Sequence, residues 1–340
     1  MGSLIFYLFW RIFVAKVPIA GYSAVVPIAG ASLSGRLLTI PFEIFSYLRL
    51  IFFPMKLFIS QHQVVEKIGD FRFWGALLAI SLFFLLLFRL LWILKSRVGW
   101  FFFFWFVISL GLVLNLYPLD MTIAERWLYF PLIGFLGLIG VFLEKFNFKK
   151  IPIFLTFLII LFSLRTFKRT FDWRNGLILF GHDIKRNQEA FDLQNNYGTE
   201  LFRDGKIDQA KPFFEKSIKL APNWWTPYNN LGVIYQRKGD FQKAKELYLK
   251  AIENGNYYLA YENLGFLILQ TETPKKAIDF INLALEKLPF NQNLRTILVI
   301  SHIRENNYEQ AILEAKKLYQ LNPSVQNRQL LEAVLRKEKI

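Results

Sequence analysis

The chain has 340 residues, of which 54% are hydrophobic, and its 41 Lys and Arg against 26 Asp and Glu give a net charge of +15. It has no cysteine, which excludes disulfides, thiolate catalysis and cysteine-based metal sites. The three histidines, His62, His182 and His302, are scattered, so we expect no metal site and no cofactor. The basic residues form no stripe interleaved with aromatics, which argues against a nucleic-acid partner.

Charge and hydropathy divide the chain into two halves. Residues 1–190 carry 20 Lys and Arg against 9 Asp and Glu, whereas residues 191–340 carry 21 against 17. The mean hydropathy of the whole chain is +0.30, which is high for an ordinary soluble protein. A basic excess beside apolar segments is typical of membrane topology signals and contacts with anionic lipids.

The first half contains apolar segments close to the length of about 20 residues that crosses a bilayer. A shorter run at 4–17 is interrupted by Arg11. It is consistent with a signal-anchor, a half-helix or the remnant of a longer span, and the absence of a preceding basic stretch argues against a cleavable signal peptide. We therefore predict an all-α fold with four to five membrane-spanning helices, the four longer ones at 74–94, 101–119, 127–143 and 151–167.

Two further segments precede the first predicted span. Residues 1–35 are predicted to form an N-terminal apolar segment and a loop, in which Val-Pro-Ile-Ala-Gly occurs twice, at 17–21 and 26–30. Within 36–73, the stretch Pro41–Phe53 mixes polar with aromatic and aliphatic residues and is followed by Pro54, which predicts an interfacial helix and an outer loop. Residues 168–190 are predicted to be a linker.

The charges of the short loops predict the orientation. Lys95 and Arg97 flank one connection and three lysines lie at 145–150, whereas residues 120–126 hold Asp120 and Glu125 against one arginine. The positive-inside rule places the two basic connections in the cytoplasm, although several basic residues after the last span oppose this. We therefore predict an integral protein of a bacterial inner membrane whose second half is extracytoplasmic.

Four alanines in the second half recur at intervals of 34, 33 and 34 residues: Ala210, Ala244, Ala277 and Ala311. This period is typical of the tetratricopeptide repeat (TPR), a helix–turn–helix unit that stacks into a solenoid. Glycines and prolines at fixed offsets support the same register. We predict an α-solenoid of four repeats, the last one degenerate, and a C-terminal capping helix: 191–224, 225–257, 258–291, 292–323 and 324–340.

Polar pairs fall at equivalent positions of the first helices of three repeats. An asparagine side chain both donates and accepts hydrogen bonds, which suits contact with a peptide backbone. The alternative is that these side chains satisfy neighbouring groups of the chain. Trp224 and Trp225 are possible anchors for a partner, and packing against the preceding repeat is the alternative for Trp225. The candidates for a peptide groove are Asn195, Asn196, Asn229, Asn230, Glu262 and Asn263.

Residues 124–134 read Ala-Glu-Arg-Trp-Leu-Tyr-Phe-Pro-Leu-Ile-Gly. This run resembles the signature of multi-spanning membrane proteins with C-terminal TPRs, the transmembrane and TPR-containing O-mannosyltransferase-like family of GT-C glycosyltransferases. It departs from the signature at Phe130 and Leu132. Segments 47–57 and 172–175 resemble a later outer loop and the link into the repeats of that family. The expected similarity covers residues 36–340.

The resemblance implies a glycosyltransferase that uses a polyprenyl-phosphate sugar, but the catalytic outer loop of that family has no counterpart here, so the catalytic residue is unknown. Glu125 and Arg126 are candidates for contact with a lipid-linked phosphate, because a guanidinium can bind phosphate bidentately. The alternative is that the two residues pair with each other. The leading hypothesis is a membrane-anchored TPR protein that binds a partner protein. The alternatives are a glycosyltransferase component that modifies a protein or glycan, and an assembly scaffold.

Overall fold

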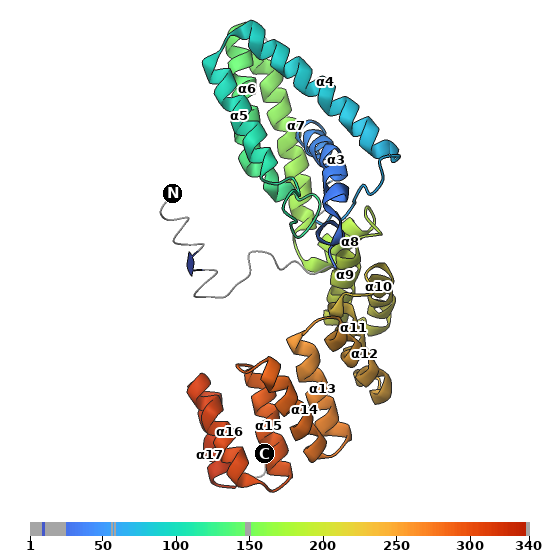
Figure 1. Cartoon of the computed structure of the whole chain (residues 1–340), viewed down its shortest axis with the longest axis vertical. Coiled ribbons are helices and arrows are strands. Elements are labelled where there is room, and N and C mark those ends of the chain that lie inside the picture. The colour runs from blue at the N-terminus through green and yellow to red at the C-terminus, as the bar shows by residue number, and fades with distance from the viewer. Residues whose placement is uncertain (1–8, 11–24, 56, 58, 147–150, 338–340) are drawn as a thin grey trace. The chain divides into compact units, whose positions relative to one another are not determined.

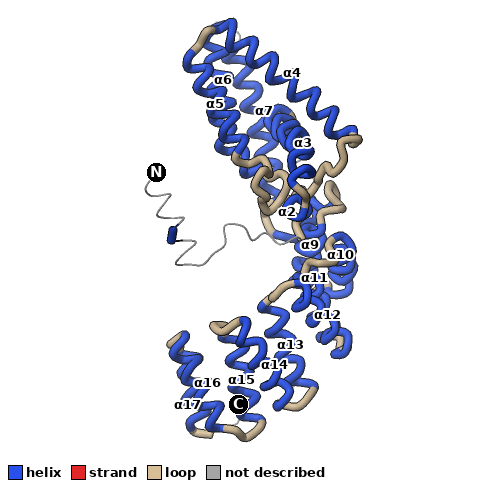
Figure 2. Tube along the Cα trace, viewed as in Figure 1, coloured by secondary structure: helices blue, strands red, loops and turns tan. Residues whose placement is uncertain are grey.

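The computed structural model describes residues 9–10, 25–55, 57, 59–146 and 151–337, and all the regular structure in these ranges is helical (Figures 1 and 2). The chain divides into two compact units, Met1–Leu193 and Gln194–Ile340. Apart from Phe9 and Trp10, the predicted N-terminal segment 4–17 lies outside the described residues, as does the first Val-Pro-Ile-Ala-Gly copy.

The helices of the first unit begin at residues suited to capping. Ser32, Asp70, Ser96 and Asn175 each accept a hydrogen bond from a backbone N–H of the first turn through their side chains. The elements are α2 (Pro27–Gly30), α3 (Leu33–Phe52), α4 (Phe71–Leu94), α5 (Arg97–Gly111), η2 (Glu125–Leu128), α6 (Tyr129–Phe146), α7 (Ile151–Asp172) and α8 (Gly176–Ile184).

The core of the first unit lies among α3, α4, α5 and α6. Tyr47 and Phe106 are fully buried there, and Ile123 joins them from the loop before η2. Helix α6 approaches α5 closely because Gly134 faces it. A Cβ atom at this position would lie 2.6 Å from the backbone nitrogen of Phe106, so a larger residue would push the two helices apart.

The prediction of four to five membrane spans is wrong for the described residues, in which two helices are long and apolar enough to cross a membrane: Phe71–Leu94 and Glu125–Lys145. This criterion uses length and composition only, and a core helix of a soluble protein can also meet it. The predicted span 101–119 is not one helix, because α5 ends at Gly111. Pro118 also disfavours helical backbone at the preceding residue, Tyr117. Residues 151–167 belong to the longer helix α7.

Helix α3 differs from the interfacial helix predicted at Pro41–Phe53. It begins eight residues earlier, at Leu33, and its polar side chains Glu43 and Ser46 are buried in the unit. The amphipathic pattern therefore reflects a buried polar contact with the rest of the chain. The loop predicted within 1–35 and the linker predicted at 168–190 are partly helical. Helix α2 covers most of the second Val-Pro-Ile-Ala-Gly copy, and α8 lies within 168–190.

The second unit is an all-α, TPR-like solenoid, as the alanine period predicts. Its helices follow one another as antiparallel pairs, and Gly205 and Gly239 make the turns inside the first two pairs with positive φ angles. The helices are α9 (Phe191–Arg203), α10 (Ile207–Leu220), α11 (Trp225–Arg237), α12 (Phe241–Asn254), α13 (Tyr258–Thr271), α14 (Pro274–Lys287), α15 (Gln292–Arg304), α16 (Tyr308–Leu321) and α17 (Val325–Leu335).

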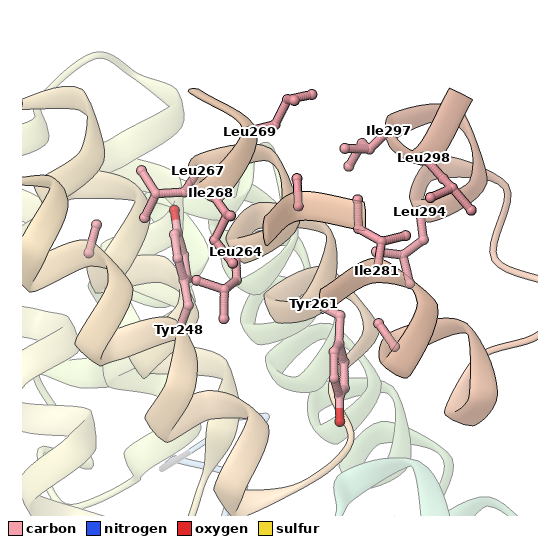
Figure 3. Close-up of a cluster of buried hydrophobic side chains, with 13 residues drawn as sticks. Tyr248, Tyr261, Leu264, Leu267, Ile268, Leu269, Ile281, Leu294, Ile297 and Leu298 are labelled. Carbon is pink, nitrogen blue, oxygen red and sulfur yellow. The ribbon is translucent and has the colours of Figure 1, made fainter. Parts of the chain in front are cut away.

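Small residues at the helix crossings explain the period. The four recurring alanines are all fully buried. At Gly232 a Cβ atom would lie 2.6 Å from the ring of Tyr248, so glycine is required for α11 to pack on α12. Tyr248 belongs to a continuous core with Tyr261, Leu264 and the other labelled side chains of Figure 3. Helix α17 buries Val334 in a second cluster, with Val299, Ile303, Ala311 and Ala315.

Candidate functional site

The polar candidates of the repeats form an inter-repeat ladder between neighbouring first helices. Asn230 Nδ2 donates to Asn195 Oδ1 at 2.9 Å, and Asn263 Nδ2 donates to Asn229 Oδ1 at 2.9 Å. Asn195 and Asn229 are only 4% and 3% exposed. Their buried amides are satisfied because each one is hydrogen-bonded. These two residues therefore join neighbouring repeats.

Glu262 extends the ladder to α15. Its carboxylate oxygens accept hydrogen bonds from Asn291 Nδ2 at 2.7 Å and Asn293 Nδ2 at 3.0 Å. Asn196 accepts from Asn195 Nδ2 at 3.2 Å. The six candidates therefore lie along adjacent first helices. The four that remain half-buried, and so accessible to a ligand, are Asn196, Asn230, Glu262 and Asn263.

Two further rows of side chains lie on the same face, and the polar pairs alone did not predict them. One row is mostly apolar and the other consists of arginines. Gln236 Nε2 reaches Gln270 Oε1 at 3.5 Å, and the Arg237 guanidinium lies 4.4 Å from the ring centroid of Phe202. Arg304 Nη1 donates to the backbone oxygen of Leu269 at 3.0 Å. We call this surface the ladder face: Asn196, Asn230, Glu262 and Asn263, with Thr199, Val233, Phe266 and Ile300, and with Arg203, Arg237 and Arg304.

The repeat period could have identified the additional rows. Thr199, Val233, Phe266 and Ile300 recur at intervals of 34, 33 and 34, the same as the alanines. Each lies one helical turn after the polar pair position, on the same helix face. Of these four residues, Phe266 is the exposed one.

Trp225 packs within the solenoid against the end of its own repeat, whereas packing against the preceding repeat was predicted. Its ring centroid lies 6.5 Å from that of Tyr257. A Cβ atom on Gly255 would lie 2.5 Å from the Trp225 ring, so glycine makes room for it. Trp224 is half-buried. This arrangement argues against Trp225 as an anchor for a partner.

Arg126, which follows Glu125 in the first unit, forms an ion pair with Asp120. Arg126 Nη2 lies 3.0 Å from Asp120 Oδ2, its guanidinium is about half exposed, and it stacks 5.4 Å from the ring of Trp127. Burial lowers the pKa of the Arg169 guanidinium, but the hydrogen bonds to Asp183 and Asp172 and the charge of Glu125 outweigh it and raise that pKa. Glu125 therefore acts electrostatically on α7.

A groove of about 580 Å³ lies beside these residues. It is mostly apolar, and Glu125, Arg165 and Arg169 are the acidic and basic residues of its wall. Arg169 is 6% exposed and its Nε atom is buried without a hydrogen-bond partner. The remaining lining comes from α3 and the loop after it, η2, α6, α7 and the residue after α7: Leu50, Ile51, Pro54, Leu57, Leu128, Tyr129, Leu132, Leu136, Phe162, Thr166, Thr170 and Trp173.

Ser60, His62 and Asp192 lie together in the same unit but do not form a catalytic triad. Ser60 Oγ is 2.8 Å from His62 Nε2, and Asp192 Oδ1 is 3.2 Å from the same ring nitrogen. A triad requires the acid on the opposite nitrogen, so this histidine could not relay a proton between them. Burial raises the pKa of Asp192, but hydrogen bonds from His62 and Ser60 outweigh it and lower that pKa. The cluster ties residues 60–62 to the start of α9.

Glu43 is a fully buried acid in the first unit's helical core. Its carboxylate accepts from Asn115 Nδ2 at 2.8 Å and from the Asn115 backbone nitrogen at 3.2 Å. Burial raises the pKa of Glu43 to about 7, although these hydrogen bonds lower it in part. Asn115 also donates to the Thr122 carbonyl oxygen, so this contact holds the loop between α5 and η2 on α3. Among the described residues, no group of three or more His, Asp and Glu could hold a metal ion.

The repeat fold and its ladder face define the class of the protein, and a comparison with protein families agrees. Residues 189–255 match the tetratricopeptide repeat family. The chain is a TPR protein. It is 31% identical to human protein O-mannosyl-transferase TMTC3 over 140 residues, which are 40% of this chain and 15% of that protein. The protein Tmtc3 of Drosophila melanogaster is 26% identical over 157 residues, 43% of this chain and 17% of its own length.

These matches cover only the repeat region, so the expected similarity over residues 36–340 was too wide. The chain matches about a sixth of the length of these relatives. Similarity also extends to bovine BBSome complex member BBS4, 31% identical over 41% of this chain and 27% of that protein. Among solved structures, the TPR protein YrrB, described as having an unusual peptide-binding site, is 21% identical with a TM-score of 0.38, covering 46% of this chain and 89% of YrrB.

Proposed function

We propose that the chain is a membrane-associated TPR protein that binds an extended segment of a partner protein on its ladder face. The observation that carries the proposal is the row of half-buried amide and carboxylate groups along α9, α11, α13 and α15. The internal hydrogen bonds hold these groups in place before a ligand arrives, which reduces the ordering cost of binding. Each repeat contributes one first helix to this face, so an extended segment of the partner meets the same kind of polar contact at regular intervals.

The membrane association rests on α4 and on residues 125–145. Only 11% and 22% of their apolar windows are buried within the chain, which leaves long apolar surfaces exposed. Surfaces of this extent are covered by lipid or by another protein. The loop charges favour repeats on the extracytoplasmic side. A scaffold for envelope assembly would use the same surfaces, and the identity of the bound segment would distinguish the two roles.

The test is selection of a random decapeptide display library on the detergent-solubilised full chain, followed by affinity measurements on the enriched peptides. We expect Asn263→Ala to weaken binding about tenfold, since it removes a polar contact from the face. The matched control is Asn282→Ala, an exposed asparagine on the second helix α14. Failure to enrich any peptide would contradict the proposal.

A second candidate function is that of a glycosyltransferase component that binds a polyprenyl-phosphate-linked sugar. It is favoured by the apolar groove with Arg165 and Arg169 in its wall, because such a groove suits an isoprenoid chain with an anionic head. Arg126 borders a neighbouring groove of about 550 Å³ but already pairs with Asp120. No residue of this chain is assigned a catalytic role.

Binding of a short-chain polyprenyl phosphate tests this second candidate. Arg165→Gln should weaken binding, and Arg126→Lys should weaken it only if Arg126 holds the phosphate bidentately. Lys250→Gln, in the second unit, is the control. Equal affinity in the wild type and in both arginine variants would reject the lipid-phosphate role.

A further inference from the structure

The ladder face carries one prominent exposed apolar side chain. Phe266 is 53% exposed, although its equivalents Val233 and Ile300 are half-buried. It lies three residues after Asn263 and four before Gln270, so all three share one face of α13. Val233, Phe266 and Ile300 therefore form an apolar spot on a face that is otherwise polar.

The charge beside this spot is positive. Arg203, Arg237 and Arg304 occupy equivalent positions one turn further along their helices, and all three are exposed. Arg203 is paired with Glu200 at 2.7 Å, so Arg237 and Arg304 are the two arginines beside the spot that form no ion pair with a carboxylate of the described residues. Arg237 stacks on Phe202, and Arg304 donates to a backbone oxygen. The face contains one acid, Glu262, whose oxygens accept from two asparagines.

We propose that the ladder face selects a peptide with an apolar side chain three or four residues away from an acidic one. This inference rests on the proposed function and names the class of peptide. The apolar side chain packs on Phe266, and the carboxylate pairs with Arg237 or Arg304 on the adjacent first helix.

The spacing follows from helix geometry. The arginine row is four residues further along the helix than Phe266, which is about 6 Å at 1.5 Å per residue. Adjacent packed helices lie about 8–10 Å apart, so the diagonal is about 11 Å. An extended chain rises about 3.3 Å per residue and covers this distance in three to four residues.

The experiment uses peptides selected from a random decapeptide display library on the detergent-solubilised full chain. We expect the enriched peptides to pair an aliphatic or aromatic residue with Asp or Glu at that spacing. Phe266→Ser and Arg237→Gln should each weaken their binding about tenfold, and added salt should weaken wild-type binding. Both residues are exposed, and an unchanged circular dichroism spectrum and thermal midpoint will show that the variants fold.

The matched controls lie on second helices. Leu283→Ser removes an exposed apolar side chain from α14, and Lys250→Gln removes an exposed charge from α12. Neither should change the affinity. If peptides are enriched but bind wild type, Phe266→Ser and Arg237→Gln equally, or if they lack acidic residues, this inference is overturned and the proposed function stands. If no peptide is enriched, both are overturned.

Discussion

Asn230 donates its side-chain amide to Asn195 across 2.9 Å, although the two residues are 35 positions apart in the chain. The contact joins the second residue of one repeat's polar pair to the first residue of the preceding repeat's pair, and Asn263 and Asn229 repeat it. The asparagines that suit a peptide backbone thus also connect the repeats to one another. The buried Asn195 and Asn229 accept hydrogen bonds from the half-buried Asn230 and Asn263, which agrees with the expectation that these side chains satisfy neighbouring groups of the chain. Contact with a peptide backbone stays a prediction.

The helix crossing at Gly232 gives a stability prediction. Ala244 is fully buried and Gly232 faces the Tyr248 ring, so Ala244→Leu and Gly232→Ala should each destabilise the second repeat by about 1–3 kcal/mol through overpacking. Thermal unfolding of the full chain followed by circular dichroism measures this. Asn282→Leu, on an exposed position of α14, is the control. An unchanged midpoint in both glycine and alanine variants would show that the repeat register is wrong.

The buried carboxyl of Glu43 gives a prediction about pH. Its folded-state pKa of about 7 lies above the ordinary value of 4.5, so the folded state binds this proton more tightly than the unfolded state. The stability it contributes is fully present below pH 4.5 and is lost as the pH rises through 7. Between these limits the loss should be about 3 kcal/mol.

The measurement is the thermal midpoint of wild type and Glu43→Gln from pH 4 to 8. The glutamine variant cannot titrate, so it should lack the fall that wild type shows over this range. Parallel curves for the two proteins would mean that Glu43 keeps an ordinary pKa.

Arg169 and Arg126 form a matched pair for testing buried against exposed ion pairs. Arg169 Nη1 lies 3.0 Å from Asp183, and both side chains are at most 8% exposed, whereas the Arg126–Asp120 pair has the same distance and is about half exposed. Arg169→Ala should destabilise the first unit by about 3–5 kcal/mol, because it removes the guanidinium partner of the buried Asp183 carboxylate. Among the described residues, that carboxylate then keeps only its contacts with His182 and the Ile59 backbone nitrogen. Arg126→Ala should cost at most about 1 kcal/mol. Equal losses of midpoint would contradict this ranking.

The orientation of the repeats is tested by fusing a reporter to the C-terminus. Alkaline phosphatase is active outside the bacterial cytoplasm, and green fluorescent protein fluoresces inside it. The loop charges predict phosphatase activity without fluorescence. Fluorescence without phosphatase activity would place the repeats in the cytoplasm.

The sequence predicted the solenoid well, because each repeat needs small residues at its crossings and these recur with a fixed period. It predicted the first half less well, because apolar runs such as 101–119 give no sign of where a helix ends. The loop that follows α5 is held by Asn115, whose side chain bonds to Glu43 72 residues away. The polar side chains of α3 led to the prediction of an interfacial helix for the same reason, because the partner that buries Glu43 lies far away in the sequence. At the candidate site, residue types suggested the asparagines, but which of them are buried depends on packing between repeats.

The central claim is that the ladder face binds an extended polypeptide. The most direct measurement is photo-crosslinking of an enriched decapeptide, bearing a photoreactive phenylalanine analogue, to the full chain, with the attachment sites mapped by mass spectrometry. We expect attachment on α11, α13 and α15, at residues of the ladder face such as Asn263, Phe266 and Ile300. Attachment confined to the second helices, or to residues before 191, would contradict it.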